Sequence, residues 1–233
     1  MGELLNSLEK QLYTDLILLC VLIATILVSI KAKKRFKILR YFPVYTVSFL
    51  IAIIVNRLSV TNHVPNKLFP LSTYLDYYLT LLELAIFSHF YYQLIQNRTV
   101  KMLIILSNLL FILFYVYMGI SDKNFYDKGI TERTQSVVYT VEGVILLILC
   151  SIYFFELFKN LPVVNLKNEP VFWVSVGLLF FMACTLPYSL MENYIEKYDS
   201  DLSFTLYSLF YIFYTILFIM IIRAYLCKPG ATA

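Results

Sequence analysis

Long apolar stretches follow one another along almost the whole chain, separated by short polar segments. A helix needs about 20 mostly apolar residues to cross the hydrocarbon core of a bilayer. Seven stretches qualify, namely residues 12–30, 39–56, 71–94, 102–120, 136–158, 170–191 and 202–226. The pattern therefore predicts an all-α, polytopic integral membrane protein, a bundle of seven transmembrane helices in a single membrane domain over residues 1–233. The second stretch is the shortest, and Pro43 is expected to interrupt it.

Composition supports this interpretation. Hydrophobic residues make up 60% of the chain and charged residues 15%, whereas soluble domains carry about 25% charged residues. The N-terminus lacks the basic segment and the small-residue cleavage site of a signal peptide, so we expect the first apolar stretch to persist as a helix. The four cysteines lie within or at the end of apolar stretches, which favours buried free thiols over disulfides.

Basic residues predict the direction in which the helices cross. The first connection, KAKKRFKILR at 31–40, carries six Lys or Arg residues and no acid. With this connection inside, twelve basic residues lie inside and seven outside. The acidic residues at 122–132 and 192–201 then lie in outside loops. We therefore expect the N-terminus outside and the C-terminus in the cytoplasm, and the basic connection is a candidate for contact with anionic lipid.

Three acidic residues stand out because charged groups inside a membrane are costly and usually functional. Asp76 and Glu83 lie in the third span and Glu142 in the fifth. The third span repeats polar or aromatic residues at spacings of three and four, which places them on one helical face. These positions are Thr73, Asp76, Thr80, Glu83 and Phe87. Facing lipid would be unfavourable, so this face is expected to point into the bundle.

Tyrosines accompany these acids. Tyr139 shares a helix face with Glu142, while Tyr188 and Tyr207 lie near the outer ends of the sixth and seventh spans. At a rise of about 1.5 Å per residue, Asp76 and Glu142 should lie in the outer half of the membrane and Glu83 close to its midplane. We therefore predict an acidic, tyrosine-lined cavity open to the outside. Its ligand-binding residues are Asp76, Glu83, Glu142, Tyr139, Tyr188 and Tyr207. Alternatively, these groups only cross-link helices.

The sequence lacks the residues that several known classes of membrane protein and enzyme need for their chemistry. A retinal protein needs a mid-membrane lysine, and the last span offers only Arg223 near its end. The two histidines are too few for a His-bound zinc site of the membrane hydrolase type. The chain also contains neither a Gly-x-Ser-x-Gly elbow nor a P-loop. We expect no enzymatic activity, no cofactor, no metal and, because the net charge of +4 reflects membrane topology, no nucleic-acid partner.

Three segments carry a resemblance to a known group of proteins. They are PVFWVSVGLLFFMACTLPYSLMENYI at 170–195, YLDYYLTLLELAIFSHFYY at 74–92 and TVEGVILLILCSIYFFELF at 140–158. Together they resemble small multi-helix inner-membrane proteins, with about seven spans, of Bacteroidetes-type bacteria. Genes for such proteins often lie near those of sensor histidine kinases or response regulators. The resemblance implies a multi-pass protein of the bacterial inner (plasma) membrane and a role in signalling, and it supplies no catalytic residues.

These observations lead to three hypotheses. The first is a non-enzymatic, receptor-like protein that binds a small ligand or partner from outside and signals through a partner protein or a homo-oligomer. The second is a small-solute or proton-coupled transporter or channel that uses Glu83. The third is a structural subunit of a membrane complex.

Overall fold

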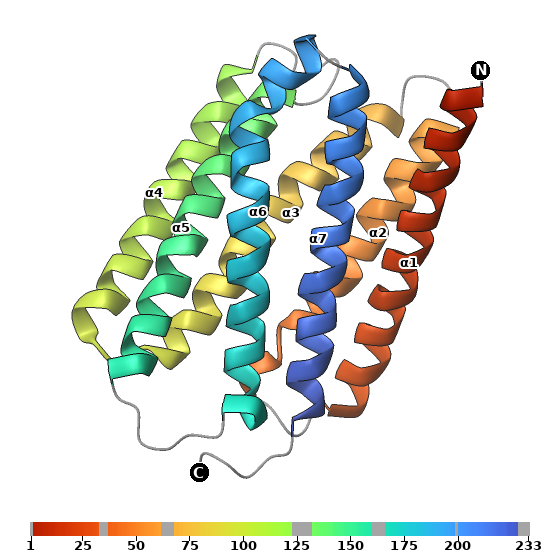
Figure 1. Ribbon diagram of the computed structural model, residues 1–233. Helices are drawn as coiled ribbons and strands as arrows, with labels where there is room; N and C mark the ends of the chain where they lie inside the picture. Colours follow the sequence, from red (N-terminus) through yellow and green to blue (C-terminus); the bar gives the residue numbers. More distant parts are fainter. Residues whose placement is uncertain are drawn as a thin grey trace. The chain divides into compact units, whose positions relative to one another are not determined.

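Nearly all of the residues that the structure describes are helical. The computed structural model describes residues 2–32, 37–61, 68–122, 132–159, 166–198 and 200–227, and these contain no strand. The all-α prediction is thereby confirmed (Figure 1). In chain order the elements are α1 (Gly2–Ala32), the 3-10 turn η1 (Lys37–Leu39), α2 (Phe42–Thr61), α3 (Leu68–Leu94), α4 (Arg98–Ser121), α5 (Glu132–Lys159), the 3-10 turn η2 (Leu166–Asn168), α6 (Pro170–Tyr198) and α7 (Ser200–Leu226).

The long helices coincide with the predicted spans. Among the described residues, six helices are long and apolar enough to cross a membrane, namely α1, α2, α4, α5, α6 and α7. The remaining long helix, α3, has 27 residues and is long enough, but it carries Asp76, Glu83 and several tyrosines. The count of seven spans and their orientation therefore stay predictions.

The second helix differs from its predicted bounds. It begins at Phe42, after the turn η1, and it continues to Thr61, beyond the predicted end at residue 56. Pro43 is thus the second residue of the helix, where a missing backbone N–H breaks no intrahelical hydrogen bond. This proline starts α2 and does not interrupt it. The apolar run from Lys37 to Leu58 spans 22 residues, enough to cross a bilayer.

Contacts divide the chain into two compact units. Residues Met1–Pro43 and Val163–Ala233 form the first, which we call the α1/α6/α7 unit. Residues Val44–Pro162 form the second, the α2–α5 unit. The prediction of a single membrane domain is not tested by this division, since each unit is described by itself.

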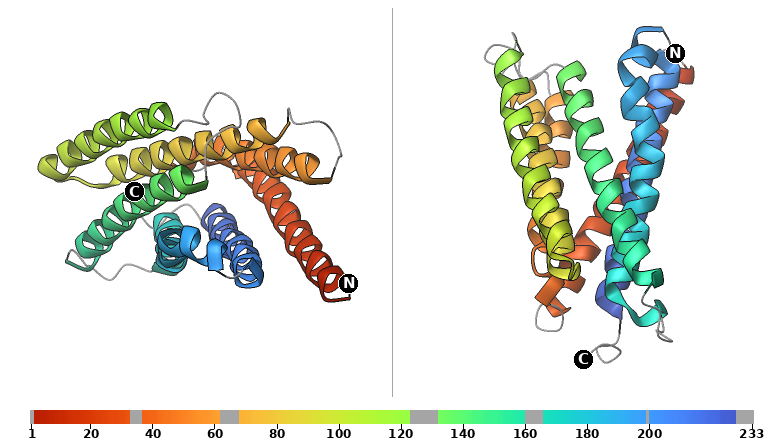
Figure 2. Two further views of the ribbon diagram at one scale, coloured as in Figure 1. Left: turned by 90° about the horizontal axis from the view of Figure 1, so that it is seen from above. Right: turned by 90° about the vertical axis from the view of Figure 1, so that its left-hand side faces the viewer.

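In the α1/α6/α7 unit, α6 packs along α7, and α7 packs along α1. Both views of Figure 2 show α6 and α7 side by side. Gly177 permits a close approach of the two helices, because a Cβ placed there would lie 2.8 Å from Cβ of Met220 and 3.4 Å from Cδ1 of Leu217. Small residues at helix contacts are the usual means by which membrane helices approach closely.

In the α2–α5 unit, α3 packs against α4 and α5, and α4 also packs against α5. Helix α4 begins at an N-cap, because the Asn97 side chain accepts a hydrogen bond of 2.9 Å from the Thr99 backbone N–H. Much of the surface of α4 is exposed and apolar, as expected for a helix that faces lipid. Helix α3 buries Thr80, Glu83 and Phe87.

Candidate functional site

The predicted inward face of α3 is buried over most of its length. Glu83 is 2% exposed, Thr80 is 1% exposed and Phe87 is fully buried, whereas Thr73 and Asp76 nearer the start of the helix are partly buried. Their spacings of three and four residues bring these side chains to one side of the helix. The Thr80 hydroxyl donates a hydrogen bond of 3.2 Å to the carbonyl oxygen of Asp76 in its own helix.

Glu83 is held from α2 by a tyrosine that the sequence analysis did not single out. The Tyr45 hydroxyl donates to Oε2 of Glu83 at 2.9 Å, and both side chains are buried. The Tyr45 ring also packs edge-on against Phe87, with 6.0 Å between ring centroids. One signal existed in the sequence. Phe42, Tyr45, Phe49 and Ala52 follow spacings of three and four residues along one face of α2, and all four are buried.

Helix α5 brings the second acid to the same unit. Glu142 is 1% exposed, and its carboxyl group interacts electrostatically with that of Glu83. Oε1 of Glu142 has no hydrogen-bond partner among the described residues. A buried polar atom without such a partner is uncommon in native structures and is often explained by a water or ion at the site. This oxygen is therefore a candidate contact for a bound group.

Tyr139 connects the acids of α3 with α5. It lies one helical turn before Glu142 and is partly buried. It interacts with the side chain of Thr80 and, electrostatically, with Asp76, Glu83 and Glu142. The α2–α5 unit therefore gathers three acids and the hydroxyls of two tyrosines, which we call the acid–tyrosine cluster (Tyr45, Asp76, Glu83, Tyr139 and Glu142). Carboxylate and hydroxyl oxygens of this kind favour cations and hydrogen-bond donors.

Two residues of the predicted cavity belong to the other unit. Tyr188 in α6 is partly buried, and its ring lies 6.1 Å from that of Phe210 in α7. Tyr207 lies in α7, and its side chain is outside the described residues. The structure thus brings four of the six predicted residues together in the α2–α5 unit. A cavity that also includes Tyr188 and Tyr207 stays a prediction.

Asp15 is a further buried acid that the sequence analysis did not single out. It lies in α1 and is 5% exposed. Its position inside the first predicted span was the available signal, since an acid at membrane depth is a functional candidate. Among the described residues, no group of three or more His, Cys, Asp and Glu side chains is arranged to hold a metal ion.

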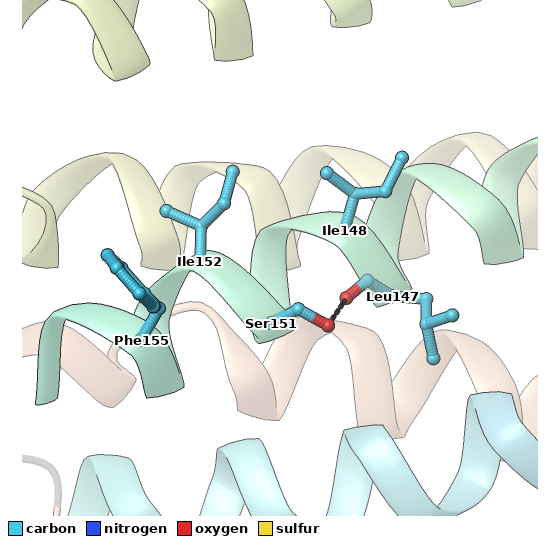
Figure 3. A pocket seen from close by; sticks show the side chains of 5 residues that line it. All are labelled: Leu147, Ile148, Ser151, Ile152 and Phe155. Carbon is cyan, nitrogen blue, oxygen red and sulfur yellow. Dashed lines mark hydrogen bonds between the residues drawn. The ribbon is translucent and has the colours of Figure 1, made fainter. Parts of the chain in front are cut away.

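A separate hollow of about 400 Å³ lies on α5 (Figure 3). It is lined by the side chains of Leu147, Ile148, Ser151, Ile152 and Phe155. The only hydroxyl of this lining donates to the carbonyl oxygen of Leu147 at 2.8 Å. The hollow is therefore apolar in character, and its lining includes none of the predicted ligand-binding residues.

Comparison with known proteins leaves the site to be interpreted from its own geometry. No family model matches the chain, and neither a curated protein nor a solved structure matches it. The resemblance to small inner-membrane proteins of Bacteroidetes-type bacteria therefore stays an expectation from the sequence.

Proposed function

We propose that the chain is a multi-pass membrane protein in which α3 also crosses the bilayer, giving seven spans. Helix α3 is longer than the about 20 residues that a span requires. Its polar residues Thr80 and Glu83 are buried inside the protein and do not face lipid. The polar residues of α3 are therefore compatible with a helix that crosses the membrane. The twelve-to-seven bias of basic residues supports an N-terminus outside and a cytoplasmic C-terminus.

Cysteine accessibility tests the crossing of α3. Single cysteines at Asn62 and Gln96, on either side of α3, are introduced into a chain without its native cysteines. We expect a membrane-impermeant maleimide to label Asn62→Cys from outside and Gln96→Cys only after the inner face is opened. Labelling of both positions from the same side would contradict a seventh span.

For the function, we propose a non-enzymatic receptor or sensor of the bacterial inner membrane that binds a small ligand at the acid–tyrosine cluster. The ligand carries a positively charged or hydrogen-bond-donating group. The observation that carries this proposal is the buried Oε1 of Glu142, which has no hydrogen-bond partner in the described part of the chain and belongs to a carboxyl group interacting with Glu83. Two ionised carboxylates are costly at membrane depth, and a cationic group relieves that cost.

The response to binding would arise where the cluster joins helices. Tyr45 of α2 contacts Glu83 of α3, and Thr80 of α3 contacts Tyr139 of α5. A ligand that competes for these oxygens changes the relative stability of two helix arrangements, which is the requirement for a switch. The signal would pass to a partner protein or to another copy of the chain.

Thermal stability of the purified chain in nanodiscs tests ligand binding. The probes are small primary and quaternary amines and the chloride salts of monovalent and divalent metal ions. A cation present at about 100 times its dissociation constant should raise the melting temperature by roughly 5–10 °C. Glu142→Gln should abolish the shift, whereas Glu156→Gln near the end of the same helix should retain it. A shift of equal size in Glu142→Gln, or no shift with any probe, would contradict the proposal.

A proton-coupled transporter is the second candidate, and the same pair of acids favours it. Because Glu83 and Glu142 are buried together, they are suited to exchange one proton between them and their surroundings. Proteoliposomes loaded with a pH-sensitive dye distinguish the two candidates. Proton flux that requires the purified chain and is lost in Glu83→Gln would favour transport, while its absence together with a cation-induced melting shift would favour the receptor.

A further inference from the structure

One end of the α1/α6/α7 unit collects the ends of its three long helices. Helices α1 and α7 end there and α6 begins there, at the lower edge of Figure 1. The Tyr225 hydroxyl of α7 donates to the carbonyl oxygen of Leu39 in η1 at 2.8 Å. The Cys227 sulfur lies 3.9 Å from the carbonyl oxygen of Lys167 in η2 and 3.4 Å from that of Arg223 in α7, and its single proton is shared between these two acceptors. Both 3-10 turns are therefore attached to the end of α7.

This end is basic and exposed. Five Lys and Arg side chains of its elements are exposed to the surroundings, and they are Lys31, Lys37, Arg40, Lys167 and Arg223. The acid described at the same end is Glu169, which is partly buried and interacts electrostatically with Cys227. The exposed surface therefore has a net positive charge, and we call it the basic end.

Aromatic rings border the basic end. The guanidinium carbon of Arg223 lies 5.4 Å from the centre of the Trp173 ring, and that of Arg40 lies 5.8 Å from the centre of the Tyr41 ring. The indole N–H of Trp173 donates to the carbonyl oxygen of Lys167 at 3.0 Å, which fixes the ring beside η2. Trp and Tyr concentrate at the interface between membrane and water, where one side of the ring is apolar and the other is wet.

The apolar segments stop at this level. The spans of α1 and α7 end at Ala32 and Leu226, and that of α6 begins at Pro170. If these helices cross the bilayer, as proposed above, the basic end lies at the depth of the lipid headgroups. Arginine matches the geometry of phosphate oxygens through its planar fork of donors, and lysine binds phosphate as a point charge.

We infer that the basic end binds the phosphate groups of anionic phospholipids in the adjoining leaflet, with Lys37, Arg40, Lys167 and Arg223 as the contacting cations. A bilayer leaflet presents such phosphates at high local concentration and at the depth where the spans end. Basic residues close to an anionic membrane surface strengthen association with it. This inference rests on the proposed membrane insertion, and it is independent of the proposed ligand at the acid–tyrosine cluster.

Trp173 reports directly on this surface because it is the only tryptophan of the chain. The full chain is reconstituted in phosphatidylcholine vesicles that contain a fixed fraction of brominated phosphatidylglycerol or, separately, of brominated phosphatidylcholine. Bromine quenches tryptophan fluorescence only at short range. We expect the anionic lipid to quench Trp173 with an apparent association several-fold stronger than that of the zwitterionic lipid. Raising the salt to 0.5 M should reduce the preference because it screens exposed charges.

A double variant identifies the residues responsible. Arg40→Gln combined with Lys167→Gln should bring the ratio of apparent association, anionic over zwitterionic lipid, close to one. Arg133→Gln changes an exposed basic residue of the α2–α5 unit and should leave this ratio unchanged. An unchanged preference in the double variant would overturn the inference, as would equal quenching by the two lipids, which shows insertion without headgroup selectivity. Loss of the preference on adding soluble inorganic phosphate at constant ionic strength would assign the site to free phosphate instead. Quenching by neither lipid would contradict membrane insertion itself.

Discussion

The two units of the chain hold their helices together by different means. In the α1/α6/α7 unit, α6 approaches α7 closely at Gly177, and rings pack between the same two helices, with 4.3 Å between the centroids of Phe181 and Tyr214. In the α2–α5 unit, the contacts between helices include a hydrogen bond of Tyr45 with Glu83 and an interaction of Tyr139 with Thr80.

Serine and threonine hydroxyls do not mark this difference, because Thr80 and Thr140 of the α2–α5 unit also donate to carbonyl oxygens of their own helices. In the α1/α6/α7 unit, Thr25, Ser29 and Thr185 donate to carbonyl oxygens of their own helices, so these bonds do not join one helix to another. Between α6 and α7 the described contacts include the close approach at Gly177 and the ring contact of Phe181 with Tyr214, and packing of this kind joins membrane helices. In the second unit, the buried acids Glu83 and Glu142 interact across helices, and we assign the proposed ligand site to them.

The largest effect is expected from filling the close approach between α6 and α7. Gly177→Leu should reduce stability by about 3 kcal/mol, since even a Cβ there meets Met220 at 2.8 Å and overpacking forces the helices apart. Thermal unfolding in detergent should show a melting temperature roughly 6–12 °C lower. Ala183→Leu places the same side chain at an exposed position of the same helix and should be tolerated. Equal tolerance of both variants would show that the contact is not tight.

A smaller effect is expected when the bond between α2 and α3 is removed. Tyr45→Phe takes the donor from a buried carboxyl group at 2.9 Å, and such a loss costs about 1–3 kcal/mol. The melting temperature should fall accordingly. Tyr78→Phe, on the exposed side of α3, is the matched control and should have little effect. A fall in Tyr78→Phe as large as that in Tyr45→Phe would mean that the hydrogen bond to Glu83 does not account for the difference.

The smallest effect is expected at the contact between α3 and α4. The Tyr77 hydroxyl donates to the carbonyl oxygen of Tyr115 at 2.6 Å, and the Tyr115 hydroxyl donates to that of Tyr77 at 3.0 Å. Their rings stack with 4.0 Å between centroids. Each Tyr→Phe change keeps the stacking and removes one hydrogen bond. The free energy of unfolding should fall by about 0.6 kcal/mol, the average contribution of an interhelical hydrogen bond.

The double variant Tyr77→Phe with Tyr115→Phe should lose the sum of the two single effects, because each bond uses a different donor and acceptor. Unfolding measurements on the two single variants and the double variant provide the comparison. Tyr117→Phe, whose side chain is 67% exposed on α4, serves as the control. A double variant that loses clearly more or less than the sum would show that the two tyrosines act as one unit.

Much of the fold followed from apolar patterning. Each predicted span corresponds to one long helix because a run of about 20 apolar residues has few alternatives to a helix in a membrane. The bounds were less accurate at α2, where Pro43 was interpreted as an interruption and proved to be a residue of the first turn. Proline has opposite consequences in a first turn and in a helix interior, and the sequence does not mark where a turn such as η1 ends.

The acid–tyrosine cluster was predictable only in part. The spacing of Thr80, Glu83 and Phe87 correctly identified the buried face of α3, because spacing along one helix is a local property. The role of Tyr45 could not be identified from the sequence, because it depends on which face of α2 meets α3. The sequence also does not indicate which of its many tyrosine hydroxyls meets a given carboxyl group.

The sequence by itself determined that the chain is helical, where its apolar helices lie and which face of α3 is buried, because these depend on composition and on a period of 3.6 residues. Only the tertiary structure decided that Glu83 meets Tyr45 and interacts with Glu142, and that Gly177 is the point of close approach between α6 and α7. Pairing between helices depends on side-chain shape and on hydrogen bonds across large sequence separations, neither of which is encoded in the pattern along a single helix.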